Sequence, residues 1–315
     1  MSALRDAIEE YVTLRRSLGF TLRDLANGLQ AFAAFAEEAG VARVTIDLAL
    51  RWATQSKGKD LATVGRRFQM VRGFARWRHA TDPRTEVPPP DLLSARYRRK
   101  PPHLYSHDDI GRLLRAARHL PSSAGLRGLT YYTLFGLLVV TGLRISEAVA
   151  LDCRDVNLED AILTIRRTKF GKSRLVPVHA STVEALSTYA RTRDRHLRRC
   201  ATDAFFVSEQ GRPITHETAR YAFARLSGQI GLRAPVRGHR YGHGPRLHDL
   251  RHRFAAQTLV QWYRAGVNVE QQLPYLATYL GHTHVTDTYW YLEAVPELLE
   301  LATRRLLESE KERVP

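Results

Sequence analysis

The sequence has very little cysteine and no long apolar segment. Only Cys153 and Cys200 occur in 315 residues, too few for a disulfide framework or a structural zinc site, so a reducing compartment is expected. No run reaches the ~18 apolar residues that identify a membrane-spanning helix. The opening segment, MSALRDAIEE, is acidic and amphipathic, unlike a signal peptide. These absences predict a cytoplasmic protein with no membrane partner.

Acidic residues are scarce relative to basic ones. Lysine and arginine number 48 against 32 aspartates and glutamates, which gives a formal net charge of +16 and a pI near 10.3. Such a charge favours a polyanion whose counterions are released on binding, and nucleic acid is the leading candidate. The alternative is a GC-rich genome that places arginine at surface positions. The 44% of hydrophobic residues excludes a disordered basic chain.

The N-terminal part, residues 1–82, is predicted to be a small helical domain. Apolar side chains recur there at helical spacing in four segments. The fourth, 61–79, carries five arginines and no acidic residue, which suits phosphate contacts better than an ordinary solvated face. Prolines then stop the helical pattern, and residues 83–103 are predicted to be a basic linker. The residues expected to contact DNA in these segments are Arg66, Arg67, Arg72, Arg76, Arg98, Arg99 and Lys100.

The second domain, residues 104–315, is predicted to be mainly helical. Ser106 precedes two acidic residues, a typical helix start, and a mostly apolar helix is expected over 124–141. The runs 161–167 and 173–178 have β-type patterns on either side of a turn, which predicts one β-hairpin. Helical patterns resume at 182–199, 215–230, 248–265, 274–280 and 296–308.

Four short segments of this domain carry side chains suited to catalysis. They are T-G-L-R ending at Arg144, the hairpin turn with Lys169 and Lys172, H-D-L-R-H at 248–252, and L-G-H ending at His282, with Tyr291 nine residues later. Arg144 follows a glycine at a turn, where a guanidinium can bind two oxygens of one phosphate. His248 and Arg251 stand three residues apart and so share one face of a helix.

Each segment also has an ordinary interpretation. H-D-L-R-H resembles a zinc motif, but Asp249 stands where that motif has Glu, and Arg251 would repel a metal between the two histidines. A structural histidine pair is another alternative. Charged residues are normal at a hairpin tip, and the aromatic side chains at 289–291 would usually belong to a core or an interface.

Taken together in this order, the four segments resemble the tyrosine recombinase (phage integrase) family over the whole second domain. The first domain and its basic linker resemble that family's core-binding domain, and the fold class expected is mainly α with a small β-hairpin. The resemblance implies Arg144 and Arg251 as phosphate-binding arginines, Lys169 as general acid, His248 as acid/base histidine, His282 as a supporting residue and Tyr291 as nucleophile. It also implies that Glu147 orients the arginines. Lys169 is preferred to Lys172 because it holds the first basic position of the hairpin motif, and Lys172 is expected to contact DNA.

The resemblance implies metal-independent strand exchange without a cofactor. Tyr291 would attack a phosphodiester to give a 3′-phosphotyrosyl bond, which a 5′ hydroxyl from a partner duplex then attacks. The implied partners are double-stranded DNA sites, three further copies in a tetramer, and other recombinases of the same element. The ending TYWYLEAVPELLELA resembles recombinases of transposons and other mobile elements, which predicts a role in integration, excision or transposition.

Three other functions use some of the same features. A type IB topoisomerase would share the site residues, and an accessory DNA-binding protein would have an inactive pocket. A metal-dependent nuclease or protease fits worst. The loop 233–246, with Arg237, Arg240 and Arg246, departs from the family pattern and is either an extra DNA contact or a solvated insertion.

Overall fold

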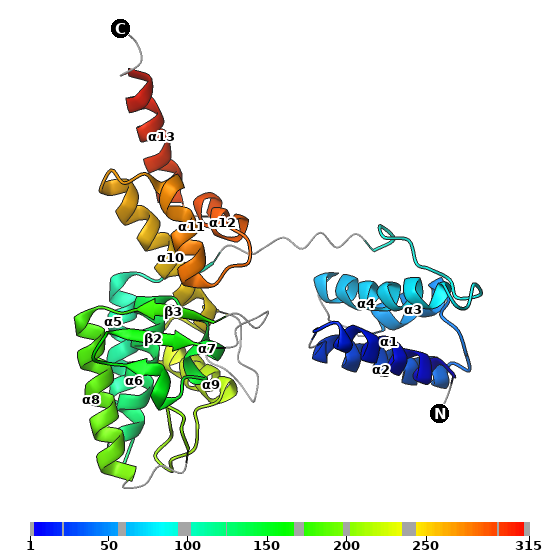
Figure 1. Cartoon of the computed structure of the whole chain (residues 1–315), viewed down its shortest axis with the longest axis horizontal. Coiled ribbons are helices and arrows are strands. Elements are labelled where there is room, and N and C mark those ends of the chain that lie inside the picture. Colours follow the sequence, from blue (N-terminus) through cyan, green and yellow to red (C-terminus); the bar gives the residue numbers. More distant parts are fainter. Residues whose placement is uncertain are drawn as a thin grey trace. The chain divides into compact units, whose positions relative to one another are not determined.

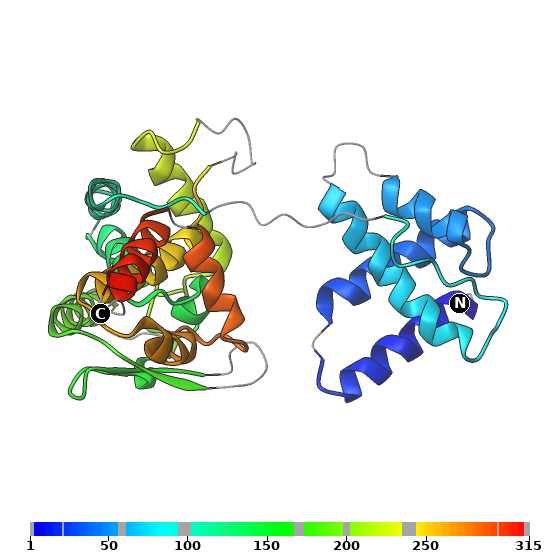
Figure 2. The same cartoon turned by 90° about the horizontal axis from the view of Figure 1, so that it is seen from above.

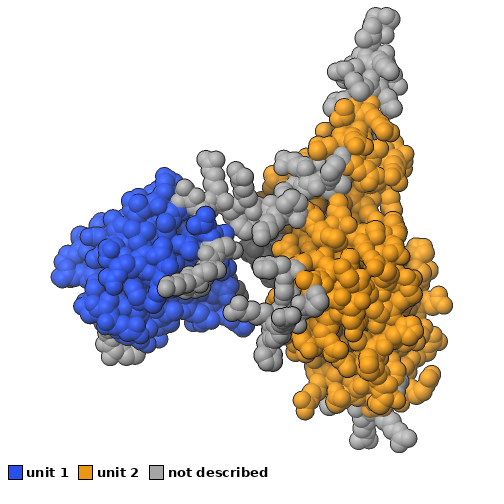
Figure 3. Space-filling view, turned by 180° about the vertical axis from the view of Figure 1, so that it is seen from behind, with its two compact units in different colours: residues 1–100 blue, residues 101–315 orange. Residues whose placement is uncertain are grey.

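The chain forms two compact units, residues 1–100 and 101–315 (Figure 3). The structure is a computed structural model. It describes residues 3–20, 22–55, 61–93, 102–123, 125–166, 173–197, 202–234, 244–294 and 296–311. Each unit has its own hydrophobic core, so each is treated separately.

Unit 1 is a helical module built on one aromatic core. Its helices are α1 (Ala3–Ser17), α2 (Arg23–Glu38), α3 (Ile46–Thr54) and α4 (Leu61–His79) (Figure 1). Phe32, Phe68 and Phe74 are fully buried at its centre. In α4 the buried residues recur every three or four positions, which leaves Arg66 and Arg76 on exposed positions.

The segment after α4 packs against unit 1 over part of the predicted linker. The Arg72 Nε group donates to the Pro88 carbonyl at 3.0 Å, and His79 Nδ1 lies 2.7 Å from the Thr85 carbonyl. Prolines stop the helix here, but they do not prevent an irregular segment from donating and accepting hydrogen bonds. The remainder of the predicted linker, with Arg98, Arg99 and Lys100, lies outside the described residues.

Unit 2 is mainly helical with one small sheet (Figures 1 and 2). Its elements are α5 (His107–Arg118), α6 (Leu126–Thr141), α7 (Ile145–Val149), the 3-10 turn η1 (Cys153–Asp155), β1 (Val156–Asn157), β2 (Ile162–Ile165), β3 (Arg174–Pro177), α8 (Ala180–Leu197), α9 (His216–Gln229), α10 (Leu247–Arg264), α11 (Val269–Leu280), α12 (Thr286–Ala294) and α13 (Pro296–Lys311). None of the helices in the described part of the chain is both long and apolar enough to cross a membrane.

The predicted hairpin is β2 and β3, and β1 adds a third antiparallel strand in the order β1-β2-β3. Leu163 faces Val176 in the register, and both are buried, whereas Ile165 faces Arg174. This register places Arg174 at the first position of β3. β1 has two residues, which is too short for a period-2 pattern to predict.

Helix α11 begins five residues before the predicted start at Pro274. Asn268 is its N-cap and accepts a hydrogen bond from the Gln271 amide at 3.3 Å. Val269 and Leu273 are buried in the first turns. Pro274 is the sixth residue of α11, so the helix continues through it without the one amide bond that this position would donate to the Glu270 carbonyl.

Helix α10 runs between two hydrophobic clusters of unit 2. Leu247 and Leu250, near its start, belong to the large cluster around α6. Later residues of α10 pack in a second cluster with Leu280, Tyr291 and Leu298 from α11, α12 and α13. Figure 1 shows α10 to α13 gathered at one end of unit 2. Residues of three of the four sequence motifs, namely T-G-L-R, H-D-L-R-H and L-G-H with Tyr291, meet between these two clusters.

Candidate active site

Two glycines end two helices beside the site. Gly142 caps the C-terminus of α6 with φ 62°, and Gly281 caps that of α11 with φ 68°, both left-handed. A Cβ atom at Gly142 would lie 2.6 Å from the Phe254 ring, and one at Gly281 would lie 2.7 Å from the Arg174 guanidinium. The T-G-L-R and L-G-H segments therefore require glycine for both conformation and space.

Three arginines bind the carbonyl groups at these two helix ends. Arg251 donates to the Gly142 carbonyl at 2.8 Å and to the Leu280 carbonyl at 2.7 Å. Arg144 donates to the Gly281 carbonyl at 3.1 Å, and Arg174 to that of Tyr279 at 2.7 Å. The last carbonyls of a helix have no helical partner and carry partial negative charge, so they attract cations.

Glu147 joins two of the arginines. Its carboxylate accepts from the Arg144 side chain at 2.9 Å and from Arg174 at 2.8 and 3.1 Å. It also accepts from the Arg144 backbone amide at 3.0 Å. Burial by itself would raise the pKa of Glu147, but the hydrogen bonds and charges of Arg174 and Arg144 outweigh it and lower that pKa.

Arg251 and Arg144 differ in exposure. Arg251 is 2% exposed, and desolvation, followed by the charge of Arg144, lowers its pKa to about 10. It stays charged at neutral pH. The Arg144 side chain is 27% exposed, so part of its guanidinium faces solvent. Arg251 thus forms the inner part of the cluster and Arg144 its outer part.

The two histidines of α10 lie one turn apart. Their ring centroids are 4.6 Å apart, edge to face. Part of the His248 side chain is open to solvent, but the protein packed around the rest of its ring desolvates it, and this desolvation, followed by the charge of Arg251, lowers its pKa to about 4. Its ring is therefore neutral at neutral pH. His252 is half-buried and lies against α12.

Tyr291 lies between two histidine rings. It is 3% exposed, and its hydroxyl oxygen is 3.3 Å from His252 Nδ1. The His282 ring stacks on the Tyr291 ring with centroids 6.3 Å apart, and His282 Nδ1 is 2.8 Å from the Thr288 hydroxyl. By contrast Tyr289, on the same helix, is 44% exposed. Of these two tyrosines, Tyr291 is the one inside the histidine and arginine cluster.

A basic cavity of about 350 Å³ opens beside Arg144 and His248. No acidic side chain is among the described residues that line it. The lining residues are Arg144, Ile145, Ser146, His216, Arg220, Phe223, Ala224, Arg233, Arg246, Leu247 and His248. Arg233 is held in place by the Pro245 carbonyl, to which its Nε donates at 2.8 Å. Such a lining suits an anion with several oxygens, such as a phosphodiester.

The structure brings five of the predicted catalytic residues together. They are Arg144, His248, Arg251, His282 and Tyr291. The hairpin turn with Lys169 and Lys172 lies outside the described residues, as do Arg237 and Arg240 of the 233–246 loop. In unit 1, Arg67 stacks over the Trp52 ring with its guanidinium carbon 4.0 Å from the ring centroid, and Arg72 is bound to the segment after α4.

Two residues of the site received no catalytic role from the sequence. Arg174 holds Glu147 and the end of α11, and its only signal was its place in the motif after Lys172. His252 contacts the tyrosine hydroxyl, whereas the motif resemblance gave a role only to His248. Each depends on a segment distant in sequence, which spacing within one motif does not indicate.

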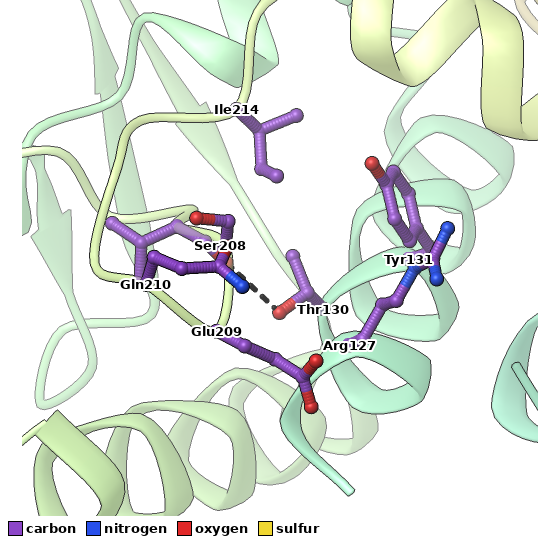
Figure 4. Close-up of a pocket in the computed structure, with 8 residues that line it drawn as sticks. Arg127, Thr130, Tyr131, Ser208, Glu209, Gln210 and Ile214 are labelled. Carbon is purple, nitrogen blue, oxygen red and sulfur yellow. Dashed lines mark hydrogen bonds between the residues drawn. The ribbon is translucent and has the colours of Figure 1, made fainter. Parts of the chain in front are cut away.

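A smaller cavity of about 280 Å³ lies between α6 and the loop after residue 204. Figure 4 shows Arg127 and Tyr131 on one side and Ser208, Glu209 and Gln210 on the other. The Thr130 hydroxyl donates to the Val207 carbonyl at 3.1 Å across this gap. Glu209 accepts from Ser122. These polar groups join the loop to α6, and we give this cavity no role in the reaction.

The histidines and carboxylates do not gather as metal ligands in the described part of the chain, where no group of three or more His, Cys, Asp or Glu side chains is arranged to hold an ion. Asp249, the residue compared above with the zinc motif, accepts from the Arg246 amide at 2.7 Å and from its side chain at 3.1 Å. These bonds close a capping box at the start of α10.

Comparisons with known proteins agree on one family. Residues 104–297 match the model of the phage integrase family. A putative integrase/recombinase, y4rB of Sinorhizobium fredii, is 49% identical over 97% of this chain and 98% of its own. The tyrosine recombinase XerD of Ralstonia nicotianae is 28% identical over 81% of this chain and 76% of its own.

Among solved structures, the Tn1549 transposon integrase in complex with transposon right end DNA has a similar fold. The TM-score is 0.66 at 17% identity, over 98% of this chain and 99% of that one. The fold class predicted from the sequence, mainly helical with a small sheet, is confirmed. Since the family model covers most of the chain and a relative is similar over nearly its full length, the chain belongs to the phage integrase family of tyrosine recombinases.

Proposed function

We propose that the protein cleaves and rejoins DNA strands at specific sites through a 3′-phosphotyrosyl bond to Tyr291. The observation that carries this proposal is the convergence of three arginines on two helix ends next to a buried tyrosine. Fixed guanidinium groups suit a phosphate whose negative charge grows during attack. A tyrosine whose hydroxyl contacts a histidine is the nucleophile that such an attack needs.

Arg251 and Arg144 would hold the non-bridging oxygens of the scissile phosphate. A guanidinium has five N–H donors. Arg251 uses two of its nitrogens on backbone carbonyls, and Arg144 uses two on Glu147 and Gly281. Both therefore keep donors for phosphate while their positions are fixed. Arg174, which holds Glu147, is proposed to orient Arg144.

Proton transfer accompanies both bond changes. The phenol of tyrosine has a pKa near 10, so its proton must pass to a base as the oxygen attacks phosphorus. A neutral histidine of α10 is suited to this, and the sequence predicts His248. As the bond from phosphorus to the 5′ oxygen breaks, Lys169 would give that oxygen a proton, which an arginine could not do. His282 would support the pocket beside Tyr291.

The covalent bond preserves the energy of the phosphodiester, so a 5′ hydroxyl of a second duplex can reverse the attack and exchange the strands. Exchange of two duplexes needs four active sites, which supports a tetramer on DNA. The transposon integrase among the structural relatives and the putative integrase/recombinase among the sequence relatives support a role in the movement of a mobile element. Other recombinases of the same element are proposed partners. Because its substrate is DNA, we propose that the protein works on the nucleoid in the cytoplasm.

The DNA contacts are proposed to have two parts. In unit 2 the basic cavity would take phosphates next to the scissile one. In unit 1, residues 1–82 would serve as the core-binding domain, with α4 supplying Arg66, Arg67, Arg72 and Arg76. Contacts to phosphates fix position and supply affinity, whereas the target sequence would be read at base edges.

Helix α13 is proposed to join copies in the tetramer. Its first turns belong to the chain's own core, because Leu298 is 1% exposed and Arg264 pairs with Glu297 at 2.6 Å. The later part projects away from the rest of unit 2 (Figure 1). Deletion of residues 305–315 should abolish assembly on DNA without unfolding the domain, as analytical ultracentrifugation would measure. Unchanged assembly would contradict docking by this segment.

The proposed function is tested with a half-site DNA from the ends of the element that encodes the protein, nicked so that cleavage traps the covalent intermediate. We expect a protein–DNA band on a denaturing gel in EDTA, and strand exchange between two intact duplexes. Bound DNA without a covalent band would indicate an accessory DNA-binding protein. Plasmid relaxation without any strand exchange would indicate a topoisomerase.

A further inference from the structure

The two histidines of α10 face different parts of the site. His248 lines the basic cavity together with Arg144. His252, one turn later, has its Nδ1 atom 3.3 Å from the hydroxyl oxygen of Tyr291, and their ring centroids are 5.5 Å apart. His252 is therefore in contact with the nucleophile, while His248 is on the side where we expect the phosphate.

We infer that His252 is the base that takes the proton of Tyr291, and that His248 contacts the phosphate; this inference rests on the proposed function. The Tyr291 oxygen forms a bond to phosphorus as the bond from phosphorus to the 5′ oxygen breaks. The phenol proton moves to Nδ1 of a His252 ring that carries its own proton on Nε2. The 5′ oxygen takes its proton from Lys169. When the strands rejoin, the neutral Lys169 amine takes the proton of the attacking 5′ hydroxyl, and the His252 imidazolium returns its proton to Tyr291.

The surroundings of Tyr291 favour a protein base over water. The tyrosine is 3% exposed and belongs to the cluster around α11 and α12, so solvent has little access to its hydroxyl. The distance of 3.3 Å is long for a bond from O–H to nitrogen. Catalytic hydrogen bonds are often long before substrate binds and shorten in the complex.

Arginines outnumber carboxylates among the described groups of the site that holds His252. Among the described residues, the charged or titratable groups of this region are His248 and Arg251 on α10, Arg144 and Glu147 at α7, Arg174 on β3, His282 after α11, and Asp287 and Tyr291 on α12. Glu147 is occupied by two arginines, so the cationic groups dominate. A bound phosphate would add negative charge and thereby stabilise the imidazolium that forms during attack.

Two substitutions at position 252 separate hydrogen bonding from proton transfer. His252→Asn keeps an oxygen near the place of Nδ1, which can accept a bond from Tyr291, but an amide does not take a proton at neutral pH. His252→Leu removes both properties. The rate of covalent complex formation on the nicked half-site is measured from about pH 6 to about pH 10. A second substrate carries sulfur in place of the 5′ oxygen, because sulfur leaves without a proton and isolates the nucleophile's side of the reaction.

At pH 7 we expect His252→Asn to slow covalent complex formation by about 10²- to 10⁴-fold on both substrates. The rate should return toward that of the wild type as the pH approaches about 10, where the phenol ionises unaided. His248→Asn, the matched control, should slow the reaction without this recovery.

Three results would overturn the inference. One is a His252→Asn protein as fast as the wild type at pH 7. Another is a slow His252→Asn protein with an unchanged melting temperature that does not recover at high pH. The third is a wild type that forms no covalent complex at all, which would overturn the proposed function as well and so is distinguished from the first two.

Discussion

The arginines of the pocket in unit 2 and those of helix α4 in unit 1 differ in how firmly the protein itself holds them. Arg251 is 2% exposed and donates to two backbone carbonyls. Arg66 and Arg76 lie on exposed positions of α4. Fixed donors need no reorganisation when charge develops in a transition state, whereas exposed cations mainly supply salt-sensitive affinity. Arginine can therefore increase the rate of the reaction in the pocket of unit 2 and the affinity for DNA on helix α4.

Among the variants that compare the two regions, the largest effect is expected from replacing the most buried arginine. A lysine at position 251 cannot reach the Gly142 and Leu280 carbonyls and a phosphate together, since its ammonium is a single point. We expect Arg251→Lys to lower the rate of covalent complex formation by about 10²- to 10³-fold, measured in single turnover at saturating DNA. Arg66→Lys, the same change on α4, is the control and should leave this rate unchanged. Equal rates of covalent complex formation for the two variants would contradict the proposed difference between the two regions.

A second difference concerns the acidic partners of arginines in the two units. Glu147 is 6% exposed and pairs with Arg144 and Arg174, so Glu147→Gln leaves buried charge without compensation. We expect the free energy of unfolding in urea to fall by about 3–5 kcal/mol. The control is Glu37→Gln in unit 1, which breaks an exposed pair with Arg5 and should have little effect.

The ion pairs of Glu147 with Arg144 and Arg174 also predict how the stability of the protein depends on pH. The pKa of Glu147 is lowered in the folded protein. Its carboxylate therefore stabilises the fold fully at any pH above its pKa in the unfolded chain, about 4.3. This stabilisation is lost as the pH falls through the pKa in the folded protein. The difference in the free energy of unfolding between the wild type and Glu147→Gln should therefore become smaller at acidic pH. A difference that stays constant down to the lowest pH at which the protein folds would argue against this ion pair.

His282 should make the pocket sensitive to mild acid. Desolvation, followed by the charges of Arg251 and Arg144, lowers its pKa from 6.5 to about 4. Between these values the unfolded chain binds a proton that the folded protein does not, so stability falls as the pH drops through this range. His282→Asn should reduce this loss, as urea unfolding at pH 7 and pH 5 would measure. An undiminished loss would mean that another group is responsible.

The smallest effect is expected on α4. Removal of Arg66 and Arg76 by alanine should weaken DNA binding and reduce the slope of log affinity against log salt by about 0.9 for each phosphate that the variant no longer neutralises. The cleavage rate at saturating DNA should not change. Fluorescence anisotropy over a range of salt concentrations measures the slope. A slope equal to that of the wild type would remove these two arginines from the DNA interface.

Much of the fold follows from local patterns in the sequence. The helix periods and the β-type runs predicted most of the helices and the β2–β3 hairpin, because a buried stripe repeats every three or four residues in a helix and every second residue in a strand. Helix α12 was not among the helical patterns. The glycines of two motifs also indicated the turns at Gly142 and Gly281. Strand β1, the early start of α11 and the packing of the segment after α4 were missed. They depend on contacts made by irregular or very short segments.

The motifs indicated five of the residues that the described site brings together, but not Arg174, His252 or the contacts between the motifs. The catalytic residues came from the motif resemblance, but the bond from Arg251 to the Leu280 carbonyl spans 29 residues, and that between His252 and Tyr291 spans 39. Spacing within a motif carries no information about a partner in another motif. The ion pair of Arg174 with Glu147 was missed for the same reason.

The central claim is that Tyr291 becomes joined to DNA, and the direct test is peptide mass spectrometry of the covalent complex trapped on the nicked half-site. The DNA-linked peptide should carry its phosphate on Tyr291, and the complex should be lost in Tyr291→Phe. It should persist in Tyr289→Phe, because that neighbouring tyrosine is 44% exposed, outside the pocket. A linkage on Tyr289, or a complex that survives Tyr291→Phe, would contradict the account.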